Sequence, residues 1–166
     1  RHKLEPIQEV ALYSLYMLGD ESQLNQKIQS FQYRIEEYTK RIAQFEKRGY
    51  KEYMDSLKDE LAQSCFDLAM VYLRIRKDKE AITLLKTAVE NNPYFSIAFY
   101  NMACAYSSVG EIDAGLDALE KAVETGYEDV GWIQKDGDLK NLHNAPRFKK
   151  LVQDLQEKLE RQLKKK

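Results

Sequence analysis

The sequence is poor in the residues that interrupt helices and build turns. Its 166 residues include only three prolines and seven glycines. An all-β domain needs turn residues between many short strands, and this chain does not have enough of them. A hydrophobic fraction of 43% beside a charged fraction of 32% is typical of helices with much solvated surface. The composition therefore predicts an all-α chain.

Cysteine is scarce as well. Cys65 and Cys104 are the only two, and both fall inside apolar helical patterns. They are predicted to be buried free thiols, and no disulfide framework is expected. This favours a cytoplasmic setting. The chain begins with Arg1 instead of Met. A membrane-tethered or periplasmic protein that has lost an N-terminal segment is therefore the alternative.

Long apolar runs and charge of one sign are also missing. No run approaches the roughly 18 residues that a membrane span needs, and no signal peptide is visible. The net charge is −1, so no global field attracts nucleic acid or an anionic surface. We therefore expect no nucleic-acid partner and no direct membrane insertion.

The residues of most active sites are absent too. His2 and His143 are the only histidines, and no sequence resembles a phosphate loop, a nucleophile elbow, a carboxylate pair or a zinc site. Asp136, Asp138 and His143 lie close in sequence, but helix capping and turn chemistry explain them more simply. The sequence thus predicts no enzyme, no cofactor and no metal.

What the chain does have is helical periodicity, beginning in residues 1–61. A short apolar helix is predicted after Pro6, ending at Gly19. A longer helix is predicted over 21–47, with a seam whose residues are spaced alternately four and three apart. The seam residues are Leu24, Ile28, Phe31, Ile35, Tyr38, Ile42 and Phe45.

Gly49 should end this long helix, and a new apolar stripe begins at once at Tyr50. With no breaker up to residue 75, one helix is predicted over about 50–75. So short a break folds two helices back into an antiparallel hairpin. The alternative is a coiled coil between two copies, in which the Leu24–Phe45 seam makes a homodimer.

Residues 62–127 contain one pattern written twice. A shift of 34 positions brings Leu68 onto Met102 and Tyr72 onto Tyr106. It also brings Ala81, Leu85 and Ala88 onto Gly115, Leu119 and Ala122. A fixed period of this length indicates stacked supersecondary units, each with two helices that cannot bury their apolar faces alone.

This pattern resembles the tetratricopeptide repeat, a 34-residue helix–turn–helix unit. Large, small and aromatic residues stand where the first helix of that family needs them, and Pro93 stands at the closing proline. Cys65 and Phe99 replace a frequent tryptophan, and Tyr127 replaces the second proline. The resemblance implies a right-handed α-α superhelix of two repeats, 62–95 and 96–127, with an extended N-terminal helical hairpin.

The resemblance also implies that a partner binds the inner face, which the first helix of each repeat lines. The matching positions here are Phe66, Met70, Leu73, Arg74, Ile97, Tyr100, Asn101 and Cys104, with Gln63 and Ser107 beside them. Phe66 and Met70 stand where the carboxylate-clamp subclass has Lys and Asn, so this chain is not expected to bind chaperone C-termini. The alternative is that the chain's own terminal helices cover this face.

Residues 128–166 are predicted to cap the array. Their pattern, Trp132 followed by Asp136-Gly-Asp-Leu139, Leu142 and Pro146-Arg-Phe148, resembles an end-of-array segment of bacterial tetratricopeptide proteins. Asp138 is predicted to cap one short helix, and Asn144 to cap the final helix with Pro146 in its first turn.

Three functions remain open on this evidence. The first is a non-enzymatic module that binds a protein or peptide through the inner face of the repeats. The second is a structural oligomeriser that pairs copies through the Leu24–Phe45 helix. The third is an interaction appendage of a larger bacterial signalling enzyme, which only the family resemblance suggests.

Overall fold

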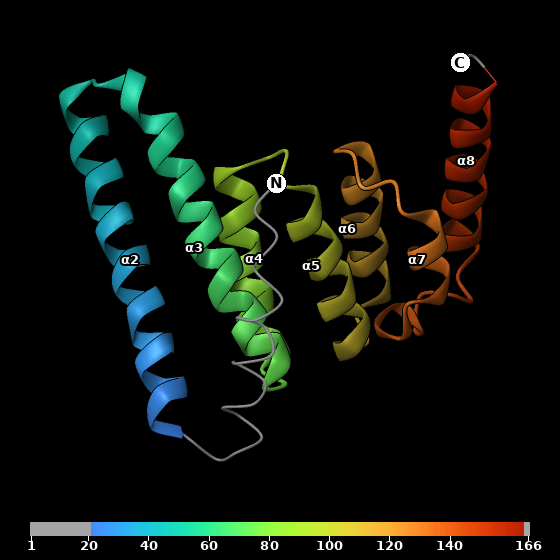
Figure 1. The fold of residues 1–166 in the computed structure, drawn as a ribbon, viewed down its shortest axis with the longest axis horizontal. Helices are drawn as coiled ribbons and strands as arrows, with labels where there is room; N and C mark the ends of the chain where they lie inside the picture. Colours follow the sequence, from blue (N-terminus) through green and yellow to red (C-terminus); the bar gives the residue numbers. More distant parts are fainter. Residues whose placement is uncertain (1–20, 165–166) are drawn as a thin grey trace. The chain divides into compact units, whose positions relative to one another are not determined.

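The protein is all-helical in residues 21–164, the part that the computed structural model describes (Figure 1). This confirms the predicted fold class, and no strand occurs in the described range. The short helix predicted between Pro6 and Gly19 lies outside these residues. The α-helices are α2 (Glu21–Arg48), α3 (Met54–Arg74), α4 (Asp78–Asn91), α5 (Ser96–Val109), α6 (Ile112–Glu124), α7 (Val130–Lys135) and α8 (Pro146–Leu163). Two 3-10 turns, η1 (Lys51–Tyr53) and η2 (Gly137–Leu139), join them.

The helices form two compact units. The first unit runs to Asn91 and holds α2, α3 and α4. The second unit begins at Asn92 and holds α5 to α8. Each repeat's own pair of helices, α3 with α4 and α5 with α6, therefore lies within one unit.

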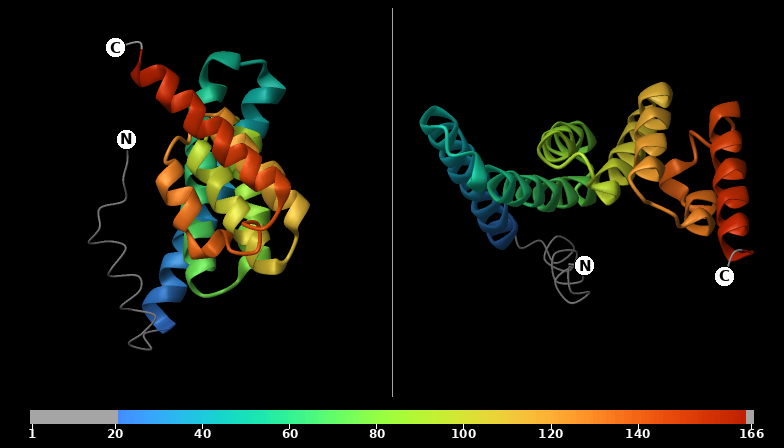
Figure 2. Two further views of the ribbon diagram at one scale, coloured as in Figure 1. Left: turned by 90° about the vertical axis from the view of Figure 1, so that its right-hand side faces the viewer. Right: turned by 90° about the horizontal axis from the view of Figure 1, so that it is seen from above.

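The first unit is built on a helical hairpin of α2 and α3, which lie side by side (Figure 2). The turn passes through Gly49, whose φ of 74° is the left-handed conformation that glycine adopts without strain. The seam of α2 packs inside the chain, where Phe31 meets Leu68 and Val71 of α3. The predicted hairpin is confirmed, and a second copy could use this seam only by displacing α3.

Within each repeat, the two helices pack against each other through small residues at the point where they cross. In the first repeat, Ala69, Ala81 and Ala88 are fully buried around Leu85. In the second repeat, Ala103 and Ala122 play the same part around Leu119. Small side chains let the helix axes approach closely while the leucines fill the space between them.

Gly115 stands where the first repeat has Ala81, and the structure gives it a packing reason. A Cβ added at Gly115 would come within 3.1 Å of Cδ2 of Leu142 and within 3.4 Å of the Cβ of Tyr106. The missing side chain therefore makes room for Leu142, which is fully buried. The C-terminal segment is packed into the second repeat instead of resting on its surface.

The caps of this segment differ from two of the predictions. Asp136, and not Asp138, caps η2, because its Oδ1 accepts the Asp138 backbone N–H at 2.9 Å. Asn144 does not cap α8, whose N-cap is Ala145 without a side-chain hydrogen bond; Pro146 follows in the first turn as predicted. Asp129, which the sequence had not singled out, caps α7 by accepting the backbone N–H of Trp132 at 2.9 Å.

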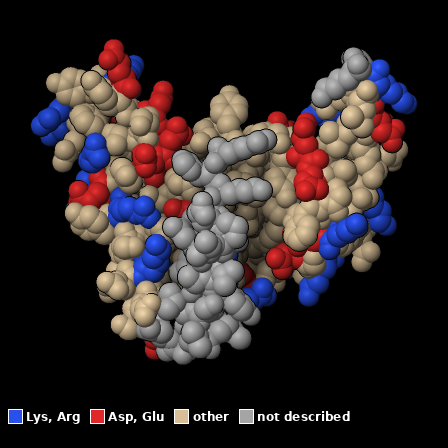
Figure 3. Space-filling model, viewed as in Figure 1, with Lys and Arg blue, Asp and Glu red and all other residues tan. Residues whose placement is uncertain are grey.

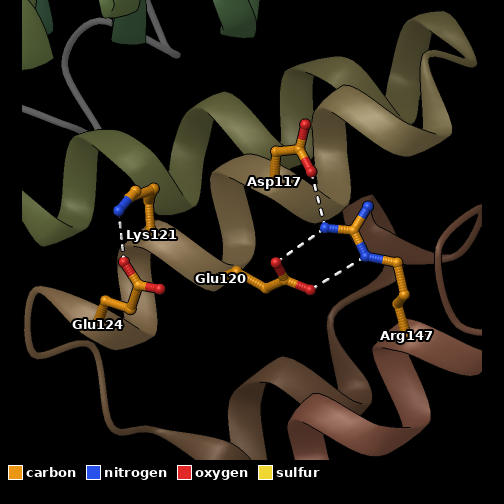
Figure 4. A network of polar contacts seen from close by, with 5 residues as sticks. All are labelled: Asp117, Glu120, Lys121, Glu124 and Arg147. Carbon is orange, nitrogen blue, oxygen red and sulfur yellow. Dashed lines mark hydrogen bonds and ion pairs between the residues drawn. The ribbon is translucent and has the colours of Figure 1, made fainter.

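Arg147 ties α8 to α6 (Figure 4). Its Nε and Nη2 donate to the two carboxylate oxygens of Glu120 at 3.1 and 2.8 Å, and Nη2 also reaches Oδ1 of Asp117 at 2.7 Å. A forked guanidinium fits a carboxylate in this two-point manner. The acidic neighbours Glu120 and Asp117 raise the pKa of Arg147. The hydrogen bonds themselves join α8 to α6.

Candidate functional site

The predicted inner face of the first repeat is the side of α3 that carries Phe66, Met70, Leu73 and Arg74. The Phe66 side chain is nearly buried, with 8% of its surface exposed. Met70, Leu73 and Arg74 are half-buried and follow one another along the second half of α3. These three side chains combine apolar surface with a guanidinium, which is a suitable surface for docking a peptide.

Asp67 places a carboxylate on this same part of α3, one 34-residue shift before Asn101. The amide of Gln63 donates to Asp67 Oδ1 at 2.7 Å, and the guanidinium of Arg34, on α2, lies 4.0 Å from Oδ2. Burial raises the pKa of Asp67, while Gln63, Arg34 and Lys27 oppose that shift. The α2 helix thus contributes charge beside the predicted inner face.

The predicted inner face of the second repeat is different, because the chain itself covers part of it. Tyr100 of α5 is only 4% exposed, and its hydroxyl donates to Asp136 Oδ2. Its ring stacks on that of Tyr127, with centroids 4.2 Å apart and planes 12° from parallel. Burial, and then the Asp136 carboxylate, raise the pKa of Tyr100 far above its ordinary value. Tyr100 therefore remains a neutral hydrogen-bond donor.

Cys104 and Ser107, which follow Tyr100 along α5, are buried as well. The Cys104 Sγ lies 3.9 Å from Asp136 Oδ2. The Asn141 side chain donates to the backbone carbonyl of Ser107 at 2.7 Å. The alternative predicted from the sequence was that the chain's own terminal helices cover the inner face. Tyr100 and Cys104 are covered, but by Asp136 and, for Tyr100, also by Tyr127, which precede the terminal helix α8.

The remaining two predicted residues, Ile97 and Asn101, are less buried than Tyr100 and Cys104. Ile97 is 37% exposed, and Asn101 is half-buried. The Asn101 amide nitrogen donates to the Ile97 carbonyl at 2.8 Å, so one of its donor hydrogens is used within α5. The eight predicted site residues are thus four on α3 and four on α5, and they belong to separate units.

Two further classes of site are absent from the described residues. Between residues 21 and 164, no three His, Cys, Asp or Glu side chains are grouped so that they could hold a metal ion. Within the same range, no helix is both long enough and apolar enough to cross a membrane.

Both cysteines are expected to resist modification in the folded protein. Burial raises the pKa of Cys65 to about 12 from an ordinary 9.0. Burial, followed by the Asp136 carboxylate, also raises the pKa of Cys104. Since the thiolate is the reactive form, Ellman's reagent at pH 8 should react with neither thiol in buffer and with both in denaturant. Rapid reaction of one thiol in buffer would contradict the packing described for its helix.

A comparison with known families identifies the doubled pattern. The family model described as tetratricopeptide repeat matches residues 62–95 and 97–125. The matched residues do not extend over 128–152, so the resemblance of that stretch to an end-of-array segment stays a prediction.

A plant protein has a related sequence. A chloroplastic protein of Arabidopsis thaliana is 34% identical over 105 residues, which cover 60% of this chain and 31% of that protein. The chain thus spans about a third of the length of this relative.

A crystal structure of MamA covers 91% of this chain and 95% of its own, at 19% identity and a TM-score of 0.49. A MamA double mutant covers 93% and 95%, at 17% identity and 0.44. The family match and the helix pairs agree: the chain is a helical-repeat protein that carries two tetratricopeptide repeats.

Proposed function

We propose that the chain is a protein-interaction scaffold that binds a peptide or helix of a partner on the α3 face of its first repeat. The main support for this proposal is the difference in exposure between the side chains of α3 and those of α5. Met70, Leu73 and Arg74 keep exposed surface on α3, whereas Tyr100 and Cys104 of α5 are buried beneath residues of the same chain. Stacked helical repeats commonly present their first helices to partners.

The other predicted functions have less support. A scaffold that pairs copies through the Leu24–Phe45 seam would need the residues that already pack on α3. That the chain is an interaction appendage of a larger bacterial signalling enzyme stays a prediction. The cytoplasmic setting and the homodimer stay predictions.

The proposal is tested by placing a charge on the α3 face. Met70→Glu should reduce recovery of the partner in an affinity pull-down by about tenfold or more, because it puts a carboxylate on a half-buried apolar surface. The matched control is Thr83→Glu on an exposed position of α4, which should leave recovery unchanged. Quantitative mass spectrometry compares the proteins retained by the wild type and by both variants.

Circular dichroism gives the fraction of each variant that is folded, so that loss of structure is not mistaken for loss of binding. If Met70→Glu folds and retains the same proteins as Thr83→Glu, the α3 face is not the binding surface.

A further inference from the structure

We infer that a basic stripe along α2 selects an acidic segment of the partner, an inference that rests on the function proposed above. The stripe is one cation at the same heptad position in every second turn of α2: Lys27, Arg34, Arg41 and Arg48. At about 1.5 Å per residue these positions are about 10 Å apart and extend over about 30 Å. Figure 3 shows Lys and Arg side chains along the α2 side of the first unit, with Asp and Glu side chains among them.

The stripe lies beside the face of α3 that is proposed to bind the partner. Each of its first three cations directly precedes a seam residue, Ile28, Ile35 or Ile42, and the seam packs on α3. The Arg34 guanidinium fixes the side on which it lies, because it is 4.0 Å from the carboxylate of Asp67 on α3. A segment docked on α3 would therefore run next to the stripe.

The acidic residues of α2 do not neutralise the stripe. Glu36 and Glu37 both pair with Lys40, at 2.7 and 3.8 Å. Within residues 21–164, no carboxylate lies within 4.0 Å of Arg41 or Arg48. Arg34 faces Asp67, so the local positive charge of the stripe comes from Lys27, Arg41 and Arg48, in a chain whose net charge is −1.

Two of the cations are also held in place before any partner arrives. The Arg34 guanidinium carbon lies 4.7 Å from the centroid of the Phe31 ring, and the Lys27 ammonium 5.2 Å. Such cation–π contacts restrict long side chains, so less conformational freedom is lost when a carboxylate binds. A helix face that only contacts solvent would not require its cations to be fixed on an aromatic ring in this way.

The form of the stripe favours one protein segment over other anions. It is one cation wide, and apolar and half-buried side chains of α3, such as Met70 and Leu73, lie on the adjacent helix. A membrane or a nucleic acid would be attracted more strongly by a broad basic surface. The partner expected here is a helix or strand with carboxylates on one edge and apolar residues beside them.

The experiment uses a fluorescein-labelled peptide of about 20 residues, with Glu repeated along one edge of a Leu-containing helix, because the natural partner is not identified. In the stripe variant Lys27, Arg41 and Arg48 become Glu, while Arg34 is kept for Asp67. The control variant changes three exposed cations away from the stripe, Lys47→Glu, Lys51→Glu and Lys79→Glu. It carries the same change in net charge.

Fluorescence anisotropy should show that the stripe variant binds the peptide about tenfold or more weakly than the wild type, since three favourable charge pairs become repulsive. The control variant should stay within about twofold, and a rise in salt from about 50 to about 300 mM should weaken wild-type binding. Equal weakening in both variants would overturn the inference. So would stronger binding of phosphatidylserine vesicles or of a single-stranded oligonucleotide than of the peptide.

A second peptide with Gln in place of every Glu separates this inference from the proposed function. If it binds the wild type as tightly as the acidic peptide and Met70→Glu abolishes binding of both, the α3 face binds partners and the stripe does not select acidic ones. If Met70→Glu leaves the binding of both peptides unchanged, the proposed function fails, whatever the stripe variant does.

Discussion

Leu142→Ala should lower the free energy of unfolding of the second unit by about 2–5 kcal/mol, the range for leaving a cavity in place of a buried leucine side chain. Leu142 has 0% of its surface exposed and occupies the space that Gly115 leaves on α6. Alanine would leave this space empty unless the surrounding helices move closer together. Urea denaturation followed by the fluorescence of Trp132, the only tryptophan, reports on this unit.

The matched control is Leu163→Ala on α8. Leu163 is 72% exposed, so the same substitution should change the stability by less than about 0.5 kcal/mol. A loss below about 1 kcal/mol for Leu142→Ala would show that the C-terminal segment is a loose cover. Tyr100 and Cys104 would then be available to a partner, and the proposal would have to include the second repeat.

Asp136→Ala should have the next largest effect, lowering the free energy of unfolding by about 2–3 kcal/mol at pH 7. The carboxylate accepts the Tyr100 hydroxyl with one oxygen and the Asp138 backbone N–H with the other. Alanine would leave the buried hydroxyl without its partner and would remove the cap of η2. Asp136→Asn should lose less, because its remaining oxygen can still accept one of these two bonds.

A double-mutant cycle isolates the bond between the two side chains. Tyr100→Phe removes only the hydroxyl and retains the stacking on Tyr127. The coupling free energy between Asp136→Ala and Tyr100→Phe should be at least about 1 kcal/mol, measured by the same denaturation. Strict additivity, within about 0.3 kcal/mol, would mean that the bond contributes nothing to stability.

Much of the fold follows from periodicity. The 4–3 spacing from Leu24 to Phe45 predicts a long helix, and the structure has one at Glu21–Arg48. The 34-residue shift places the helix pairs of both repeats, and Pro146 marks the start of α8. These features depend on residues close together in the chain, where spacing determines which side chains share a helical face.

The covering of α5 is harder to predict. Tyr100 and Asp136 are 36 positions apart, and residues 128–145 have no period that would orient their side chains. Both acids of the Asp136-Gly-Asp138 turn are suitable caps, and only the packed structure distinguishes them. The inner-face pattern of the family therefore identifies Tyr100 and Cys104 correctly as α5 positions, but contains no information on what lies above them.

The α2 stripe is an intermediate case. The heptad spacing of Lys27, Arg34, Arg41 and Arg48 is visible in the sequence, yet surface charges at such spacing are common on solvated helices. Its meaning depends on the Arg34–Asp67 contact, which shows that the stripe adjoins α3. That contact joins two helices across a hairpin, so it requires the register of the hairpin to be known.

The contacts of Tyr100 with Asp136 and Tyr127 limit how this protein could be lengthened. A third repeat inserted after residue 127 would displace the segment that satisfies the Tyr100 hydroxyl and fills the space at Gly115. A longer version would need new residues at both positions, for example Ala at 115 and an apolar residue at 100. In its present sequence the second repeat is therefore not suited to stack on a third repeat. Any fragment made to study the second repeat alone should extend at least through Leu155, which is still buried.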